Sequence, residues 1–181
     1  MIFQPLAIPD VILITPHVFE DERGFFMETF RQHEFEQYCG QYQFVQDNHS
    51  RSSQGVLRGL HYQLHQPQGK LVRVTQGEAF DVAVDLRQHS ATFGQWVGAT
   101  LNEHNKQMLW IPPGFAHGFF VTSATMELQY RCTDYYAPDD EYVIHWQDSD
   151  LAIQWPGTPC NQAISGKDQQ GLSFKKAPKF Q

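Results

Sequence analysis

The sequence lacks the motifs that mark most of the common enzyme classes. It contains no Gly-x-Gly-x-x-Gly, no Gly-Lys-Ser/Thr loop, no Gly-x-Ser-x-Gly elbow and no His-Glu-x-x-His pattern. These absences argue against dinucleotide-binding dehydrogenases, P-loop enzymes, the common serine hydrolases and zinc proteases. No apolar run of about 18 residues and no charged-then-apolar leader is present either, so the expected location is the cytoplasm.

Cysteine and positive charge are also scarce. The three cysteines, Cys39, Cys132 and Cys160, lie far apart with no Cys-x-x-Cys pair, which predicts neither a disulfide framework nor a zinc ribbon. Thirteen basic against twenty acidic residues give a net charge of −7, which argues against a nucleic-acid-binding face. A few arginines in a cleft can still bind a phosphorylated small molecule.

Short β-type runs fill most of the 181 residues, and neither a repeat nor a linker divides them, so we expect one domain over 1–181. One stretch has helical spacing, Gln32–Cys39, and Gly40 is placed to end it. The polar tail 161–181 predicts a loop plus a short helix. The runs predict an all-β antiparallel sandwich or barrel, with strands over 8–19, 25–30, 44–50, 56–63, 68–74, 80–86, 96–101, 107–111, 118–123, 126–133 and 142–147.

The stretch 56–74 holds the strongest chemical signal. Two β-type runs flank a Pro- and Gly-containing loop, which predicts a pair of adjacent strands with His61 near Lys70. A group that titrates near neutrality, beside a cation that can hold negative charge, suits proton abstraction next to a carbonyl. A lone strand histidine is more often structural, and strict alternation would put Arg58 and His61 on opposite faces unless Gly59 supplies a bulge.

Other polar residues allow two interpretations when they are considered alone. Tyr130 shares a face with apolar neighbours, so it is either a packed core tyrosine or a proton donor. His117 lies in a turn that matches the second half of a cupin metal motif in outline, but the first half is missing, so we expect no metal. Considered alone, Asp168 is expected to be a surface carboxylate, and the acidic run 139–141 is expected to be a solvated loop. Arg23 and Glu28 are expected to form a surface ion pair.

Several long runs, in order, resemble the dTDP-4-dehydrorhamnose 3,5-epimerase family over about residues 8–168. The runs that carry the resemblance are Asp21–Phe26, Phe44–Ser50, Arg58–Gln63, Gln68–Arg73, Phe80–Asp85, Phe93–Trp96, Trp110–Phe119 and Tyr130–Tyr136. The resemblance implies a cupin-like β jelly roll that acts as a homodimer with neither metal nor cofactor. It implies conversion of dTDP-4-dehydro-6-deoxy-D-glucose to dTDP-4-dehydro-L-rhamnose, in the supply of rhamnose for polysaccharides.

The resemblance also implies roles for individual residues. His61 resembles the general base, held by the carboxylate of Asp168; Lys70 resembles the cation that stabilises the C4 oxyanion, and Tyr130 the acid on the opposite face. Phe26 and Tyr136 are expected to stack on the ligand or to pack in the core. Positions that resemble contacts to nucleotide, pyrophosphate or sugar, some of them from a neighbouring subunit, are Arg23, Glu28, Gln46, Asp47, Asn48, Arg58, His117, Glu141 and Lys167.

Three other functions compete with this interpretation. A sugar-nucleotide 3-epimerase that inverts one centre would use the same His61, Lys70 and Tyr130. A non-catalytic cupin would bind the nucleotide sugar without turnover, although the joint presence of base, cation and acid argues against it. A metal-dependent cupin oxygenase ranks third and would require bound metal.

Overall fold

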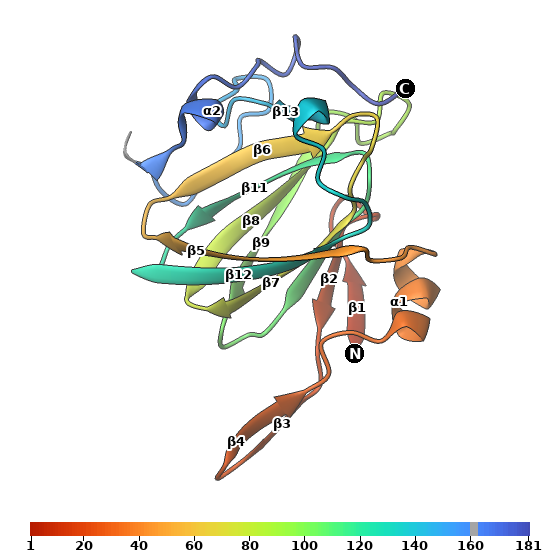
Figure 1. The fold of residues 1–181 in the computed structure, drawn as a ribbon, viewed down its shortest axis with the longest axis vertical. Helices are drawn as coiled ribbons and strands as arrows, with labels where there is room; N and C mark the ends of the chain where they lie inside the picture. The colour runs from red at the N-terminus through yellow and green to blue at the C-terminus, as the bar shows by residue number, and fades with distance from the viewer. Residues whose placement is uncertain (160–162) are drawn as a thin grey trace.

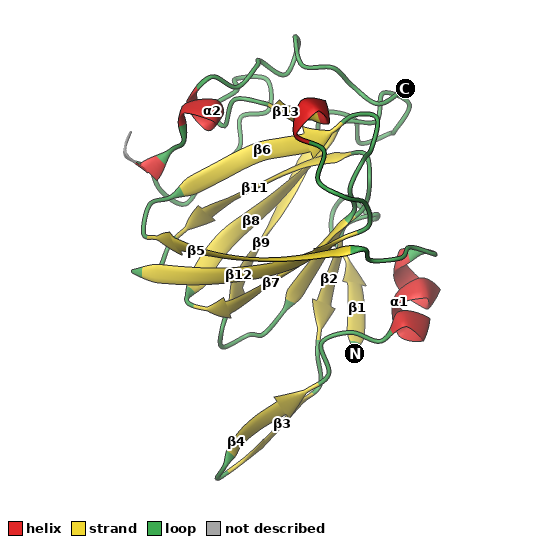
Figure 2. Ribbon diagram, viewed as in Figure 1, coloured by secondary structure: helices red, strands yellow, loops and turns green. Residues whose placement is uncertain are grey.

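Two antiparallel sheets face each other in the computed structural model, which describes residues 1–159 and 163–181 (Figures 1 and 2). The six-stranded sheet has the order β1 (Ile2–Pro5), β2 (Ile12–Thr15), β10 (Met108–Ile111), β7 (Lys70–Gln76), β12 (Thr125–Cys132) and β5 (Gln46–Ser53). The five-stranded sheet has the order β13 (Glu141–Val143), β6 (Leu57–Gln63), β11 (Phe115–Val121), β8 (Glu78–Asp85) and β9 (Trp96–Asn102). This arrangement is the predicted cupin-type jelly roll.

Among the described residues, four smaller elements lie outside the two large sheets. The strands β3 (Val18–Asp21) and β4 (Gly24–Met27) form a hairpin that, within the described part of the chain, pairs with no other strand and projects from the body (Figure 1). Helix α1 (Gln32–Cys39) has the predicted bounds and ends at Gly40, whose φ of +96° favours glycine. A 3₁₀ turn (Pro138–Asp140) precedes β13, and the tail holds the short α2 (Gly166–Gln169).

Apolar alternation on the strands builds two cores. Between the sheets, Val72 and Leu128 of the six-stranded sheet pack with Ala83 and Val121 of the five-stranded sheet, all at 0% exposure. On the outer face of the five-stranded sheet, the other side of β8 packs against the C-terminal segment around Ala177. Strand β8 is therefore buried on both faces, which explains its nearly continuous apolar sequence.

The predicted pairing of strands within 56–74 is wrong. Strand β6 belongs to the five-stranded sheet and β7 to the six-stranded sheet, and neither pairs with the other. The segment between them crosses from one sheet to the other instead of turning back. His61 and Lys70 therefore come from opposite walls of the sandwich, not from one hairpin.

Several strand bounds also differ from expectation. The range 8–19 divides into β2 and β3, 142–147 shortens to β13, and β1 was not predicted. Cys160 and the first residues of the predicted tail lie outside the described residues. Among the described residues, no helix is long and apolar enough to cross a membrane.

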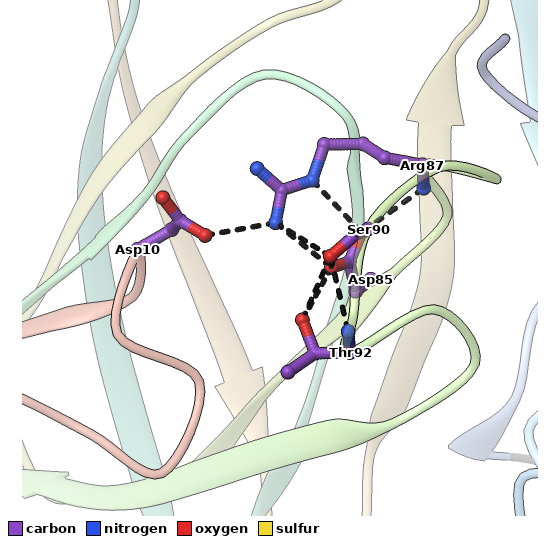
Figure 3. Close-up of polar contacts among 5 residues, drawn as sticks. All are labelled: Asp10, Asp85, Arg87, Ser90 and Thr92. Atoms are coloured by element: carbon purple, nitrogen blue, oxygen red, sulfur yellow. Dashed lines mark hydrogen bonds and ion pairs between the residues drawn. The ribbon is translucent and has the colours of Figure 1, made fainter.

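The loop after β8 is anchored by a buried carboxylate (Figure 3). Asp85, whose side chain is fully buried, accepts hydrogen bonds from Nε of Arg87 at 2.9 Å, Ser90 at 2.6 Å and Thr92 at 2.7 Å. Arg87 also reaches Asp10 at 2.9 Å, which ties this loop to the N-terminal segment. Burial acts to raise the pKa of Asp85, but the hydrogen bonds from Arg87, Ser90 and Thr92 outweigh it and lower the pKa to about 2.

Candidate active site

A cavity of about 340 Å³ opens between the two sheets. Both sheets contribute polar side chains to its wall, which sets it apart from the apolar core beside it. Most of the predicted site residues meet here. The predicted residues that line it are Gln46, Asn48, Arg58, His61, Lys70, His117, Tyr130, Tyr136 and Glu141.

A bulge in β6 brings Arg58 and His61 into the same cavity. His61 pairs with His117 on β11, but Arg58 pairs with Phe119, so β6 carries one extra residue between these two points. Glycine is required at this crossing, because a Cβ on Gly59 would lie 2.5 Å from the Cα of Gly118. The bulge that Gly59 could supply is therefore present.

The imidazole of His61 contacts the carboxylate of Asp168. Its Nε2 lies 2.7 Å from Oδ1 of Asp168, a residue only 2% exposed. The contact is short but poorly directed, because Oδ1 of Asp168 lacks a hydrogen-bond partner of good geometry among the described residues; it is an ion pair when His61 is protonated. Oδ2 accepts a hydrogen bond from the hydroxyl of Ser165 at 2.8 Å. The interpretation of Asp168 as a surface carboxylate is wrong.

The surroundings of Asp168 favour its ionised form. Burial acts to raise the pKa of this carboxyl, but the contact with His61 and the hydrogen bonds of Ser165 and the Gly59 amide outweigh burial and lower it. A permanent anion at Nε2 fixes the orientation of the imidazole ring.

The second nitrogen of His61 also faces a carboxylate. Nδ1 lies 2.8 Å from Oε1 of Glu141, at the start of β13. The hydroxyl of Tyr136 donates to Oε2 of Glu141 at 3.0 Å, and the ammonium group of Lys167 contacts the same oxygen. Glu141 is thus part of the site, and its interpretation as a solvated loop residue is wrong.

Lys70 and Tyr130 belong to the opposite wall. Burial lowers the pKa of Lys70, and the nearby Cys132 and Asp81 only partly oppose it. Burial raises the pKa of Tyr130, Cys132 and Tyr136 add to this effect, and Arg58 opposes it. The phenol is therefore neutral at pH 7, and within the described part of the chain no hydrogen bond or ion pair occupies the Lys70 ammonium.

Asp81 is a site residue that the sequence interpretation missed. Its fully buried carboxylate faces Nε2 of His117, at 2.9 Å from Oδ1 and 3.0 Å from Oδ2. A buried carboxylate needs such a partner. The available signal was the presence of two acidic residues, Asp81 and Asp85, inside the otherwise apolar run 80–86.

Lys167 does not line the cavity but contacts Glu141 at its wall, and four other predicted binding residues lie outside the cavity of this single chain. Arg23 and Phe26 are on the β3–β4 hairpin. The predicted pair of Arg23 with Glu28 is wrong, because Arg23 binds Asp21 at 2.5 Å and Glu28 binds Arg31 at 2.8 Å. The fourth residue is Asp47.

Asp47 points away because the residues of β5 alternate between the two faces of the sheet. It lies 3.5 Å from Arg131 on the outer face, whereas Gln46 and Asn48 face the cavity. Among the described residues, no group of three or more His, Cys, Asp or Glu side chains is arranged to hold a metal ion.

Comparisons with known proteins agree on one family. The family model for dTDP-4-dehydrorhamnose 3,5-epimerase matches residues 5–176. A dTDP-4-dehydrorhamnose 3,5-epimerase from Pseudomonas aeruginosa is 58% identical over 97% of both chains. A dTDP-6-deoxy-D-glucose-3,5-epimerase from Legionella pneumophila, solved with dTDP-4-keto-L-rhamnose, is 49% identical with a TM-score of 0.94, covering 99% of this chain and 98% of its own.

A more distant structural relative shows that this fold does not by itself specify how many centres are inverted. A 3′-monoepimerase from Streptomyces bikiniensis, solved with dTDP-quinovose, is 31% identical with a TM-score of 0.86, covering 93% of this chain and 86% of its own. One framework thus appears in enzymes named for one inversion and in enzymes named for two. By the near-complete family match and the 58% identity, this chain belongs to the dTDP-4-dehydrorhamnose 3,5-epimerase family.

Proposed function

We propose that this chain inverts C3 and C5 of dTDP-4-dehydro-6-deoxy-D-glucose to give dTDP-4-dehydro-L-rhamnose. One observation carries the proposal: a carboxylate-held imidazole lies on one wall of a cavity, and an ammonium and a neutral phenol lie on the other. A sugar ring between the walls would meet a base on one face and an acid on the other. Inversion requires this arrangement, because a base acting alone returns the proton to the face it came from.

In the first half of each inversion His61 acts as the base. It takes the proton from the carbon beside the C4 ketone, and the electron pair of the C–H bond moves into the carbonyl to form an enolate. The ammonium of Lys70 stabilises the negative charge on the enolate oxygen. In a buried site that stabilisation is strong, since little water screens the two charges.

In the second half Tyr130 acts as the acid. Its hydroxyl gives a proton to the carbon from the opposite face, and the enolate returns to the ketone. Both C3 and C5 flank the same carbonyl, so one set of groups serves both centres. These steps require no metal or redox cofactor.

Arginine and polar groups around the cavity would hold the nucleotide part. Among the described residues, the side chain of Arg58 donates only to the hydroxyl of Ser52, at 3.2 and 3.3 Å, which leaves guanidinium donors for the pyrophosphate. We propose that Gln46, Asn48 and His117 contact the rest of the ligand. Asp81 then fixes the ring of His117.

We further propose a homodimer in which the β3–β4 hairpin of one chain reaches the other. The hairpin exposes three aromatic residues, Phe19 at 60%, Phe25 at 57% and Phe26 at 70%, and projects away from its own body (Figure 1). Exposed aromatic clusters of this kind are typical of interfaces. The hairpin would bring Arg23 and Phe26 to a site in the partner. The proposed location is the cytoplasm.

Deuterium exchange tests the proposed reaction. The protein is incubated with dTDP-4-dehydro-6-deoxy-D-glucose in heavy water, and deuterium at C3 and C5 is followed by NMR. We expect incorporation at both carbons, and His61→Asn abolishes it while nucleotide binding persists. Incorporation at C3 alone would make the chain a 3-epimerase, and binding without incorporation would make it a binding protein.

A further inference from the structure

Two inversions by one base raise a question of proton balance, and the following inference rests on the proposed function. After the first inversion His61 carries the proton that it removed, and Tyr130 lacks the proton that it gave. His61 cannot act again until it loses that proton. A protein that inverts twice without releasing its ligand therefore needs a path from His61 to water while the cavity is occupied.

The contacts of His61 leave only one nitrogen for that path. Nε2 contacts the carboxylate of Asp168 at 2.7 Å, and Asp168 is itself only 2% exposed. His117 faces His61 from the neighbouring strand β11, but its Nε2 is directed to Asp81. Nδ1 faces the cavity side, where Oε1 of Glu141 lies 2.8 Å away.

Glu141 joins this nitrogen to the surface. Its own side chain is 11% exposed, and its second oxygen contacts two groups that are much more exposed. These are the ammonium of Lys167, with a side chain 48% exposed, and the hydroxyl of Tyr136, a residue 51% exposed. The carboxylate thus lies between the buried base and solvent-accessible polar groups.

We infer that Glu141 removes the proton from His61 between the two inversions and passes it to water. In this step the Nδ1–H bond of His61 breaks and an O–H bond forms on Oε1 of Glu141. His61 becomes neutral and able to abstract again, and Glu141 returns to its anion when water takes the proton. The Tyr130 phenolate takes a proton from water in the same interval, so that it can act as the acid a second time. No electrons are transferred, and Lys167 balances the charge of the restored carboxylate.

Glu141→Gln is the main test, because glutamine keeps the size and a hydrogen-bonding oxygen but cannot accept the proton. The reaction is run in heavy water with enzyme in excess of substrate, so that His61 starts without the transferred proton. We expect the first exchange to persist, and the second to slow by roughly 100-fold. The singly inverted sugar should accumulate and be visible by NMR.

Two further variants separate proton removal from binding or folding. Asp168→Asn impairs the base in both inversions, so the two exchange rates should fall together. Glu141→Ala should show the same selective loss as glutamine, and added acetate should restore the second exchange in proportion to its concentration. Weaker binding or partial unfolding would lower both exchanges and would not respond to acetate.

The outcomes distinguish this inference from the function on which it rests. If Glu141→Gln exchanges both carbons at the wild-type rates, or if both rates fall equally, the role of Glu141 is overturned and the proposed function is not. Absence of exchange at either carbon in the wild type would overturn the proposed function, and the inference with it. A selective, acetate-rescued loss of the second exchange supports both.

Discussion

At the residue scale, the site depends on how burial changes the charge state of Asp168 and Lys70. Asp168 is buried beside His61 and keeps its charge, whereas the Lys70 ammonium has no hydrogen-bond or ion-pair partner within the described residues, and burial destabilises its charge. Desolvation acts on both groups: the contacts of Asp168 outweigh it and keep a fixed anion beside His61, whereas Lys70 remains a cation that is available to the reaction.

Asp168→Asn should reduce kcat by about 10³- to 10⁴-fold, as loss of the orienting carboxylate does in other histidine bases. The reason is that Nε2 of His61 would lose its negative partner, so neither ring orientation nor the positive charge after abstraction would be stabilised. Calorimetry should show that dTDP still binds. A kcat within tenfold of wild type would contradict the role of Asp168.

The pH dependence of kcat should report on Lys70. Because burial lowers its pKa, kcat should fall on the basic side below the ordinary lysine value of about 10.4, as the ammonium loses its proton. Tyr130 and Cys132 do not mask this limb, because burial raises the pKa of both.

The variant Asp81→Asn tests whether Lys70 causes the fall of kcat on the basic side. Removing the negative charge that favours protonated Lys70 should move the basic limb to still lower pH. Stopped-flow measurements with a pH-jump keep the protein folded during the assay. A basic limb that is unchanged in the variant would show that Asp81 does not act on Lys70.

At the element scale, two contacts fix the strands that carry the site. The loop after β8 is held by Asp85, and β6 approaches β11 through Gly59 and Gly118. Both contacts lie away from the proposed chemistry, but they determine where β6 and β8 place His61 and Asp81.

Asp85→Asn should lower the free energy of unfolding at pH 7 by about 3 kcal/mol, because the neutral amide keeps only one acceptor oxygen and no charge for Arg87, Ser90 and Thr92. The pKa of Asp85 is lowered from 3.8 to about 2, so its ionisation stabilises the fold above the unfolded pKa and this contribution is lost as pH falls toward 2. The difference between wild type and variant should therefore shrink by about 2 kcal/mol between about pH 5 and about pH 2. Urea titrations at several pH values measure it; a constant difference would contradict the prediction.

Gly59→Ala should destabilise the fold by about 1–3 kcal/mol, the range for overpacking a tight contact. The added Cβ would lie 2.5 Å from the Cα of Gly118, which is backbone and cannot move aside, and the φ of +133° disfavours alanine as well. Gly166→Ala is the matched control, since nothing lies within 4 Å of its Cβ. Chemical denaturation should leave this control within about 0.5 kcal/mol of wild type.

At the scale of the whole molecule, the projecting hairpin is the feature that one chain does not explain. Strands β3 and β4 pair with each other and with no other strand of residues 1–159 and 163–181, and their phenylalanines face solvent. A second chain would bury these side chains, and it would also bring Arg23 to a site in the partner.

Phe26→Ser should weaken dimerisation by about 2 kcal/mol or more, the range for an aromatic anchor at an interface. Sedimentation equilibrium measures the effect. Phe93→Ser is the control, because Phe93 is 37% exposed but lies outside the hairpin, and it should leave the dimer unchanged. A wild-type protein that is monomeric at micromolar concentration would contradict the homodimer.

The sequence by itself determined the fold class and the helix Gln32–Cys39, because strand alternation and helical spacing are local properties of the chain. The resemblance named the family, and the near-complete family match confirms it.

Only the tertiary structure decided which residues meet. The sequence cannot show whether the chain turns back after β6 or crosses to the other sheet, since both use the same turn residues; it crosses, and this puts His61 opposite Lys70. The same holds for Asp81 with His117 and for Glu141 with His61. Their carboxylates are distant in sequence, and their roles follow from burial and a contact that only packing creates.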